Sequence, residues 1–380
     1  MDYDVVIVGA GPAGSCAARF LAEGGAKVAL VDAARFPRPK PCAGWINERA
    51  LGEFPFLDAV RRKVKAAPFK CLVFHSPDLK QTARFANRSH VGYIVTREKF
   101  DAELVAVARA AGVKTFLGKK VVGVDSGEAS VAAILADGAR VTGRILVGAD
   151  GVRSTVARAA GLRPHWGEEA LVLTLSKTIP LTPRQRATCF GDTSSIHVAL
   201  GFGGAPGYAW AFPGAAQCNV GIGVRTCDAA RLRKLYDAWV AGLRDRGLVP
   251  ATAKLDAPDA AAVPAGAAID FENHVGKRVV LIGDAGGFAS SASSEGIYPA
   301  IRSAAIAVRS ILRAIDCDRA SRKGAPCQDE LQAFKVQWRQ QLASYIQMPN
   351  VNAAFLLPLI YSNQEIADRF GRAFLFGENL

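Results

Sequence analysis

Long apolar runs are missing from this 380-residue sequence. The longest, Val351 to Ile360, covers about ten residues and contains Pro358, whereas a helix that spans a bilayer needs about 18 or more apolar residues. The first residues lead directly into a β-branched run, without the basic and then apolar segments of a signal peptide. We therefore expect no transmembrane segment and a cytoplasmic location.

The cysteine and histidine residues also lack a pattern. The eight cysteines contain no C-x-x-C pair and have no companion histidine cluster, which excludes an ordinary zinc site. We expect reduced thiols and no metal. None of the five histidines has a spacing that nominates it as a catalytic base, so all five are expected to be structural or exposed: His75, His90, His165, His197 and His274.

The charge is strongly basic, with a formal net charge of +13. The Lys and Arg residues are spread along the chain rather than clustered, which argues against nucleic acid as a partner. Two interpretations stay open: a solvated basic surface, or attraction to an anionic membrane surface, an acidic partner or dinucleotide phosphates. Length and composition indicate a globular protein of about two intermixed domains.

The N-terminal residues carry the strongest local signal. A β-branched run, Asp4 to Val8, ends in Gly9-Ala10-Gly11-Pro12-Ala13-Gly14, an amphipathic segment follows to about Glu23, and a second apolar run ends at Asp32. This G-x-G-x-x-G lies between a strand and a helix, with an acidic residue 18 positions after its third glycine. The context predicts a Rossmann βαβ unit that binds a dinucleotide.

Each position of this turn has a physical role. Gly9 permits the tight turn, Gly11 lets the backbone approach the pyrophosphate, and Gly14 lets the helix lie close to the strand. The helix N-terminus, with Ala13 in its first turn, offers N–H groups to the phosphates. Asp32 should accept hydrogen bonds from the adenosine ribose.

Two later segments place a carboxylate just past a predicted strand. Val141 to Val147 is followed by Gly148-Ala149-Asp150-Gly151, and Arg278 to Ile282 by Gly283-Asp284. Ligands of doubly wound sheets bind at such strand ends, so the two segments indicate a long, extended cofactor.

Together, Gly9-x-Gly11-x-x-Gly14, Ala149-Asp150-Gly151 and Gly283-Asp284 resemble the three fingerprints of the flavoprotein hydroxylase superfamily. This superfamily has the p-hydroxybenzoate hydroxylase fold and includes group A flavin monooxygenases and flavin halogenases. The resemblance covers about residues 1 to 315. It implies non-covalent FAD, with Asp284 on the ribityl chain, Arg97 against the FAD, and Asp150 near the pyrophosphate region and its neighbouring backbone. It also places the backbone of Gly296-Ile297 at the pyrimidine edge of the flavin, where a helix N-terminus would stabilise the reduced, anionic ring.

A second dinucleotide fingerprint is not found. Gly201 to Gly207 is rich in glycine, but a predicted strand follows it rather than a helix, so it is expected to be a hairpin loop. NAD(P)H, the expected electron donor, would bind transiently in a surface cleft, as the resemblance implies.

Two motifs narrow the subfamily. Pro41-Cys42-Ala43-Gly44 and Tyr208-Ala209-Trp210-Ala211-Phe212-Pro213 are similar to the P-C-x-G and Y-x-W-x-F-P motifs of the geranylgeranyl reductase family, whose members use reduced FAD to saturate prenyl double bonds. Ala43 stands where the family usually has Gly, Trp45 replaces another small residue, and Gly214 follows Pro213 where the family often has Lys. Because a Trp beside Cys42 reduces the room near the flavin, a long polyprenyl substrate is in doubt.

The candidate catalytic residues are Cys42, Tyr208 and Trp210. Cys42 lies in a stiff turn and would donate a proton, shape the pocket at the flavin face, or be an ordinary buried side chain. Tyr208 and Trp210 lie on one face of a strand and are expected to be pocket walls. The expected cofactor-binding residues are Gly9, Gly11, Ala13, Gly14, Asp32, Cys42, Ala43, Arg97, Asp150, Gly283, Asp284, Gly296 and Ile297.

The expected fold class is α/β, a Rossmann-like FAD domain with an inserted sheet-based substrate domain and a C-terminal helical extension. The FAD domain would comprise residues 1–66, 96–164 and 270–316, and the substrate domain residues 67–95 and 165–269. The C-terminal helical region, 317–380, would begin with a polar linker, 316–326, and contain helices at 329–345 and 365–376. The apolar stretch 351–360 would pack, cap the pocket or touch a membrane.

Three functions remain open. The leading hypothesis is a geranylgeranyl-reductase-like enzyme that delivers hydride from reduced FAD to an apolar unsaturated substrate. The alternative is a flavin monooxygenase acting on an aromatic or peptide-borne side chain. Halogenation is less favoured, because Tyr208 and Phe212 replace the outer residues of the halogenase W-x-W-x-I-P motif. The third hypothesis is a non-catalytic flavin-binding protein.

Overall fold

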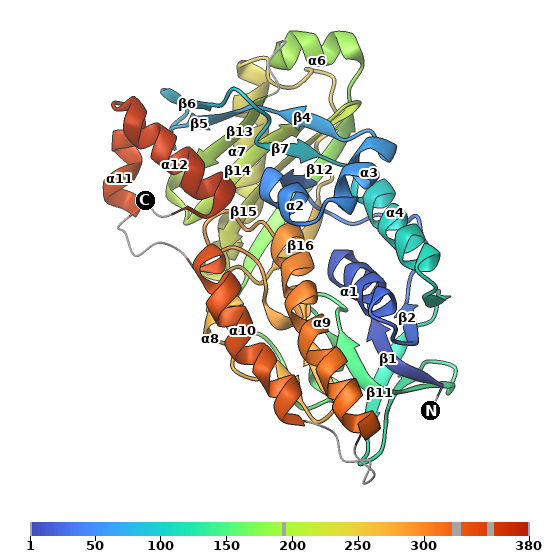
Figure 1. Cartoon of the computed structure of the whole chain (residues 1–380). Coiled ribbons are helices and arrows are strands. Elements are labelled where there is room, and N and C mark those ends of the chain that lie inside the picture. The colour runs from blue at the N-terminus through green and yellow to red at the C-terminus, as the bar shows by residue number, and fades with distance from the viewer. Residues whose placement is uncertain (1, 192–194, 321–327, 348–352, 379–380) are drawn as a thin grey trace. The chain divides into compact units, whose positions relative to one another are not determined.

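The computed structural model describes residues 2–191, 195–320, 328–347 and 353–378, which form two compact units (Figure 1). Each unit is assembled from three separate stretches of the chain. The first unit comprises Met1–Arg38, Asp101–Gly167 and Pro264–Met348. The second unit comprises Pro39–Phe100, Glu168–Val263 and Pro349–Leu380.

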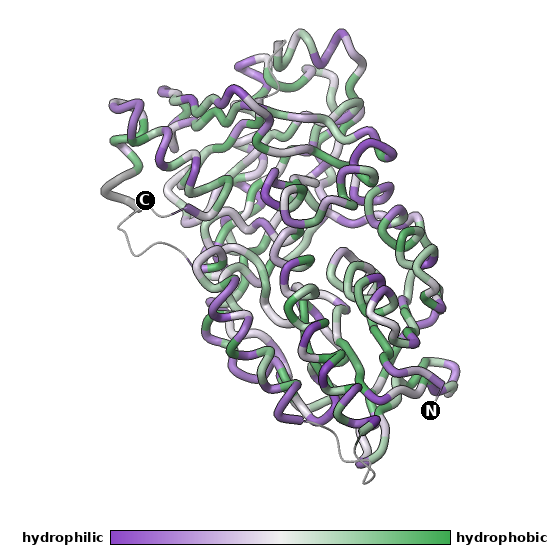
Figure 2. Tube along the Cα trace, in the orientation of Figure 1, coloured by the Kyte–Doolittle hydropathy of each residue, from purple (hydrophilic) through white to green (hydrophobic). Residues whose placement is uncertain are grey.

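The first unit is built on a mainly parallel sheet in the order β17-β18-β11-β1-β2-β8, and β10 and β9 extend from β11 as an antiparallel ribbon. The buried parts of the central strands are apolar on both faces, as expected for parallel strands covered by helices, and Figure 2 shows β1 mainly in the hydrophobic colour. The strands are β1 (Tyr3–Val8), β2 (Val28–Asp32), β8 (Lys114–Leu117), β9 (Val121–Ser126), β10 (Val131–Leu135), β11 (Arg140–Gly148), β17 (Val275–Gly276) and β18 (Val279–Leu281).

Helices α1, α9 and α10 form a packed series in this unit, with α9 between the other two (Figure 1). Helix α1 ends beside α9, because Gly24 has no side chain and its Cα lies against Leu312. The helices of the unit are α1 (Pro12–Glu23), α4 (Arg97–Ala110, whose first four residues belong to the second unit), α5 (Thr155–Ala159), α8 (Ala267–Asp270), the 3-10 turn η4 (Gly283–Gly286), α9 (Ile297–Ala320) and α10 (Gln328–Ile346).

The second unit contains a seven-stranded sheet in the order β16-β12-β15-β14-β13-β5-β6. All neighbours are antiparallel except β13 and β5, which are far apart in sequence and pair in parallel. The strands are β5 (Cys71–His75), β6 (Thr82–Ala86), β12 (Val172–Pro180), β13 (Ser195–Leu200), β14 (Gly207–Pro213), β15 (Gln217–Arg225) and β16 (Asp259–Val263).

Different helices cover the two faces of this sheet. Ala209 and Ala211 of β14 face a core that includes Trp239 of α7 (Leu232–Asp245). Trp210 and Phe212 face the opposite core, which contains apolar residues of α12 (Gln364–Phe376). The last helices of the chain thus lie beside the early strands β5 and β6 (Figure 1).

A small antiparallel sheet and short helices complete the second unit. The sheet has the order β3-β7-β4. Its strands are β3 (Trp45–Asn47), β4 (Ala67–Phe69) and β7 (Gly92–Ile94). The remaining helices are α2 (Glu48–Glu53), α3 (Phe56–Lys63), α6 (Pro183–Phe190), α11 (Ala353–Ile360) and the 3-10 turns η1 (Glu168–Ala170), η2 (Phe202–Gly204) and η3 (Thr226–Arg231).

The predicted α/β class is confirmed, and the chain is grouped differently from the expected domains in two places. Residues 39–66 belong to the second unit, because β3 pairs with β7. Of the expected C-terminal region, α10 belongs to the first unit while α11 and α12 belong to the second. The sequence cannot reveal this division, since it depends on which core each amphipathic helix covers.

The structure also bears on the expected linker, the apolar stretch and the absence of a transmembrane helix. Helix α9 continues to Ala320, through the first part of the expected linker, and residues 321–327 lie outside the described part. The apolar stretch 351–360 is described only from 353, as α11. No helix in the described ranges combines the length and apolarity needed to cross a bilayer.

The expectation of reduced thiols throughout is wrong for Cys317, near the end of α9, which is disulfide-bonded. Disulfide formation depends on the distance between two Cα atoms in the fold, which irregular cysteine spacing does not reveal. The free thiols among the described residues are those of Cys16, Cys42, Cys71, Cys189, Cys218 and Cys227.

Candidate dinucleotide site and apolar face

The three fingerprint segments meet at one edge of the first unit's sheet. Strands β18, β11 and β1 are parallel neighbours, so their carboxyl ends lie together. The N–H of Ala149 donates to the Val8 carbonyl at 2.8 Å, and the N–H of Ile282 donates to the Gly148 carbonyl at 2.9 Å. The residues that follow these strands therefore surround one crevice, as predicted for a doubly wound sheet.

Gly9 and Gly14 are required by the fold itself. A Cβ atom on Gly9, which has φ +101°, would lie 2.2 Å from the Ala149 carbonyl oxygen. A Cβ atom on Gly14 would lie 1.8 Å from the Gly9 oxygen. Both contacts are with backbone that cannot turn away, which confirms the predicted tight turn and the close helix–strand approach.

Gly11 is different, because nothing in the protein requires a glycine there. Its φ is −72°, which any residue can adopt, and a Cβ atom would meet no protein atom closer than 3.8 Å. The space beside Gly11 opens at the N-terminus of α1, which has Pro12 in its first turn, no side-chain cap and no acidic residue in the first turn. This arrangement suits a phosphate group held by backbone N–H groups.

Arg38 lies beside this turn and was missed by the sequence analysis. Its Nη2 atom is the group 3.8 Å from the Cβ position on Gly11, and it forms an ion pair of 3.2 Å with the fully buried Asp101. The buried carboxylate holds the guanidinium in place, so a cation is present where a pyrophosphate would need one. No local motif marks Arg38, although its partner Asp101 lies four positions after Arg97, which the resemblance placed against the FAD.

Asp32 at the end of β2 already accepts two backbone hydrogen bonds. The N–H of Ala10 donates to Oδ2 at 2.6 Å, and the N–H of Ala34 donates to Oδ1 at 2.7 Å. Asp32 therefore ties the glycine-rich turn to β2. Each carboxylate oxygen can accept a further hydrogen bond, so the ribose contact remains a prediction.

Asp150 supports the backbone that follows it. It accepts hydrogen bonds from the Ser154 hydroxyl at 2.5 Å and from the N–H groups of Thr155 and Val156 at 2.7 and 3.0 Å. Burial raises the pKa of this carboxyl, while these hydrogen bonds lower it. The predicted support of neighbouring backbone agrees with these bonds, whereas a role near the pyrophosphate remains a prediction.

The segments around Gly283 and Gly296 complete the crevice. A Cβ atom on Gly283, with φ +56°, would lie 2.7 Å from Cβ of Ala13, so this turn is pressed against the start of α1. A Cβ atom on Gly296 would lie 3.5 Å from Oδ1 of Asp284. The predicted ribityl ligand and the predicted flavin-facing helix start, which Ile297 begins, are therefore neighbours within one unit.

In the second unit, one backbone contact joins the segment that carries Cys42 to the segment that carries Arg97. The carbonyl of Gly44 accepts a 2.8 Å hydrogen bond from the Val95 N–H, and a Cβ atom on Gly44 would lie 2.0 Å from the Val95 oxygen. Cys42 and Ala43 precede this contact and Arg97 follows it, all partly exposed. The N–H of Gly44 donates to Cys42 Sγ at 3.3 Å, which orients the thiol.

The aromatic residues of β14 lie on one face, as predicted. Trp210 is buried and donates its indole N–H to Asn219 Oδ1 at 2.7 Å, which leaves it without a polar group for chemistry. Tyr208 is partly exposed, and its ring lies 5.6 Å from that of Trp210 and 5.5 Å from that of Phe374. Trp210 is thus a core residue, Tyr208 lies at the edge of that core, and their role as pocket walls remains a prediction.

Trp45 belongs to the same aromatic layer. Its ring stacks on Phe374 at 5.7 Å, with an interplanar angle of 3°, and meets Phe69 edge-on at 6.5 Å. Trp45 is therefore packed inside the second unit.

Three histidines are structural within their units. His75 Nε2 and His197 Nδ1 lie 3.0 Å apart in the second unit, and His274 Nε2 lies 2.9 Å from the Gly286 carbonyl in the first. Burial lowers their pKa values, to about 4 for His75 and about 3 for the other two.

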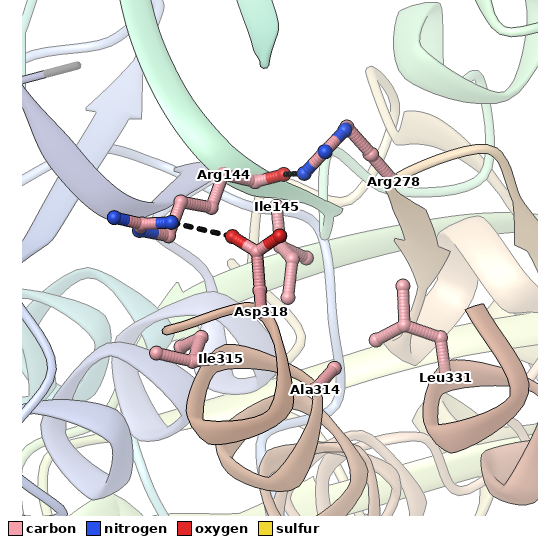
Figure 3. Close-up of a pocket in the computed structure, with 7 residues that line it drawn as sticks. All are labelled: Arg144, Ile145, Arg278, Ala314, Ile315, Asp318 and Leu331. Atoms are coloured by element: carbon pink, nitrogen blue, oxygen red, sulfur yellow. Dashed lines mark hydrogen bonds and ion pairs between the residues drawn. The ribbon is translucent and has the colours of Figure 1, made fainter. Parts of the chain in front are cut away.

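Within the described residues, no group of three or more His, Cys, Asp or Glu side chains could hold a metal. Figure 3 shows a small pocket of the first unit at the amino end of β18, whereas the crevice lies at the carboxyl ends of the strands. In this pocket Asp318 forms an ion pair with Arg144, and the Arg144 carbonyl accepts a hydrogen bond from Arg278 Nη1 at 3.0 Å. These contacts join α9 to β11. The pocket is lined by Arg144, Ile145, Arg278, Ala314, Ile315, Asp318 and Leu331.

Comparison with known proteins agrees with this geometry. The family described as "FAD binding domain" matches residues 2–321. Menaquinone reductase of Mycobacterium tuberculosis H37Rv is 32% identical over 309 residues, covering 77% of this chain and 72% of that protein. Digeranylgeranylglycerophospholipid reductase 1 of Methanococcoides burtonii is 29% identical, covering 78% and 73%.

The chain belongs to the geranylgeranyl reductase family of FAD-dependent oxidoreductases. The resemblance seen in the Pro41–Gly44 and Tyr208–Pro213 motifs is thereby confirmed.

Solved structures show the same fold. A geranylgeranyl bacteriochlorophyll reductase-like protein from Thermoplasma acidophilum has a TM-score of 0.78 at 22% identity, and the match covers 99% of the present chain and 97% of the Thermoplasma chain. The flavin-dependent halogenase CmlS has a TM-score of 0.66 at 19% identity, covering 100% and 68%. At these identities the likeness concerns the fold alone.

Proposed function

We propose that this member of the family uses reduced FAD to saturate a carbon–carbon double bond of an apolar, prenyl-bearing substrate. Two observations together carry the proposal: the chain has a dinucleotide crevice, and its relatives are named as reductases of a quinone and of a geranylgeranyl lipid. The FAD supplies the hydride, and the protein binds, orients and encloses the reactants.

The first unit provides the groups that would hold the cofactor. N–H groups at the start of α1 and the guanidinium of Arg38 suit the pyrophosphate, and Asp32 suits the adenosine ribose. Asp284 suits the ribityl hydroxyls, because a carboxylate accepts strong hydrogen bonds from them. The start of α9 at Ile297 would face the flavin.

The apolar face of β14 supports an apolar substrate. Tyr208 is the partly exposed member of an aromatic cluster whose other members, Trp210 and Phe374, are buried, and the indole N–H of Trp210 is already satisfied. A substrate that covers the exposed part of the Tyr208 ring gains free energy at about 25 cal/mol per Å² of apolar area. The cluster offers few polar groups, which suits a prenyl chain better than a polar ring.

Cys42 is the proposed proton donor or pocket-shaping group. Its thiol is partly exposed, in a turn held by the Gly44–Val95 contact. A thiol that accepts a hydrogen bond from Gly44 N–H keeps its own proton available for transfer. Tyr208 and Trp210 act as walls in this proposal.

The electron donor and the location of the substrate are further parts of the proposal. NAD(P)H would bind transiently, and the protein would work in the cytoplasm. The net charge of +13 would favour a peripheral encounter with an anionic membrane that holds the substrate. Co-sedimentation with vesicles tests the encounter: binding to anionic vesicles should exceed binding to zwitterionic ones and should weaken with salt.

The decisive experiment incubates the FAD-loaded, reduced protein with a prenyl substrate, such as menaquinone or a geranylgeranyl lipid, with and without oxygen. Saturation predicts a product with two additional hydrogen atoms and slow loss of reducing equivalents to oxygen. A product that gains an oxygen atom only in air would replace the proposal with a monooxygenase. Protein that binds FAD but changes no substrate under either condition would favour a non-catalytic flavoprotein.

A further inference from the structure

Glu295 is a buried carboxyl group to which the proposed function assigns no role. It immediately precedes Gly296 and α9, and its exposed fraction is only 5%. A carboxyl in such a place is costly to ionise unless its environment compensates the charge.

The contacts of Glu295 join two helices. Oε1 accepts a hydrogen bond from the Tyr298 N–H at 2.8 Å, and the Tyr345 hydroxyl donates to Oε2 at 3.0 Å. The two tyrosine rings meet edge-on at 4.8 Å. A cap for α9 needs only an acceptor, which an amide would also supply, so these contacts do not by themselves require an ionisable group.

The surroundings of Glu295 bring its pKa close to neutral pH. Burial raises its pKa to about 7, whereas hydrogen bonds from Tyr298 N–H, the Tyr345 hydroxyl and Ile297 N–H oppose the rise, and the Asp284 carboxylate adds to it. On α9, the nearest basic side chain in sequence is Arg302, which donates to Gln341 of α10 at 3.1 Å. The groups that act on Glu295 are therefore one carboxylate, from η4, and neutral donors from α9 and α10.

We propose that Glu295 takes up a proton when the bound flavin is reduced, so that the reduced cofactor is accompanied by a neutral carboxyl. The inference rests on the proposed function, in which the flavin lies at Gly296–Ile297. Two electrons from a reductant and one proton reduce the flavin to its anionic form, and a second proton from solvent converts the Glu295 carboxylate to the acid. Added negative charge at the start of α9 makes ionised Glu295 less favourable, because like charges in a poorly solvated site repel strongly.

The test is the midpoint potential of the FAD-loaded protein, titrated with dithionite from about pH 6 to about pH 9. Each proton taken up with two electrons contributes about 30 mV per pH unit. Below about pH 7 Glu295 is already neutral, so the slope should correspond to one proton. Above it the slope should approach two protons, about 60 mV per pH unit.

Glu295→Gln keeps an acceptor for Tyr298 N–H and should fold, but it cannot titrate. Its slope should remain at one proton throughout, and its potential should match the wild type near pH 6 and exceed it near pH 8. Tyr345→Phe removes a hydrogen bond that lowers the pKa of Glu295, so its change of slope should move to higher pH. Glu272→Gln, which alters an exposed carboxylate paired with Arg339, is the matched control and should behave as wild type.

A second readout observes the proton directly. The infrared difference spectrum between reduced and oxidised protein at about pH 8 should contain a carboxylic acid band that Glu295→Gln lacks. A one-proton slope in the wild type across the whole range, or identical slopes in the wild type and Glu295→Gln, would overturn the inference. Failure to bind FAD would instead overturn the proposed function, so the two failures are distinguishable.

Discussion

Alanine substitutions at Gly11 and Gly14 should have opposite consequences, although the two residues lie three positions apart. The Cβ atom of alanine at position 14 would lie 1.8 Å from the Gly9 carbonyl oxygen, inside the fold. The same atom at position 11 would have no protein neighbour closer than 3.8 Å. The first change therefore strains the polypeptide, and the second occupies only the space that we assign to the pyrophosphate.

The magnitudes follow from these distances. Overpacking typically costs about 1–3 kcal/mol, and a 1.8 Å approach to backbone should cost at least the upper end of that range. A helical alanine gives back about 1 kcal/mol, so Gly14→Ala should lower the free energy of unfolding by roughly 2 kcal/mol or more. Gly11→Ala loses a favourable N-cap residue, at about 1 kcal/mol, and gains about 0.4–1 kcal/mol from the less flexible unfolded chain. Its net change without cofactor should be within about 1 kcal/mol. Loss of even one charge-assisted hydrogen bond to phosphate, at about 1.5–3 kcal/mol, weakens FAD binding at least about tenfold.

Two measurements check this pair. Urea unfolding of flavin-free protein gives the free energy of unfolding of each variant, and fluorescence titration with FAD gives the dissociation constant. Gly11→Val, with two more methyl groups, should lose FAD altogether and should still fold. The reasoning would be refuted if Gly11→Ala destabilised the flavin-free protein as much as Gly14→Ala, or if it bound FAD with the wild-type affinity.

Further predictions concern the cofactor, the chemistry and pH. Asp284→Ala should weaken FAD binding about tenfold or more, because it removes charge-assisted hydrogen bonds, and an unchanged dissociation constant would show that this carboxylate is no ligand. Cys42→Ala should keep its FAD and be reduced normally, but it should turn over substrate at least about tenfold more slowly. Cys42→Ser should resemble it, because a hydroxyl is a weaker acid than a thiol. Full activity in both variants would make Cys42 a packing residue. Because burial depresses the histidine pKa values, unfolding takes up protons between about pH 6.5 and about pH 4, and stability present at neutral pH should fall as the pH drops through this range. Glu295, whose pKa is raised, offsets up to one of these protons between about pH 4.5 and about pH 7. Urea unfolding at about pH 7 and about pH 5 checks the sign, and equal stability at both would contradict it. The histidines concerned are His75, His197 and His274.

Local chemistry in the sequence was sufficient for the elements of the dinucleotide crevice. The β-branched run before Gly9 and the glycines after it specify strand, turn and helix through short-range sterics. Strand β1 begins one residue before the expected run, and α1 ends at the expected Glu23 but begins at Pro12, inside the glycine-rich motif. The alternation of Tyr208, Trp210 and Phe212 likewise predicted a strand with one aromatic face, since side chains of a strand alternate between faces.

Groups that act through distant partners were decided only by the tertiary structure. Arg38 is near the crevice because the buried Asp101 holds it, and Glu295 is perturbed because Tyr345, 50 residues away, and the surrounding core enclose it. Neither residue has a neighbour in sequence that reveals this burial. The division of the C-terminal helices between two units has the same origin.

The sequence by itself determined the glycine-rich βαβ unit and the aromatic face of β14, because short-range geometry and side-chain period are local properties of the chain, and its resemblance to known flavoproteins implied FAD. Only the tertiary structure decided that Gly11, unlike Gly9 and Gly14, faces space free of protein, and that the carboxyl at the start of α9 is buried. Burial and long-range electrostatics depend on which segments pack together, and that is the information a single sequence carries least directly.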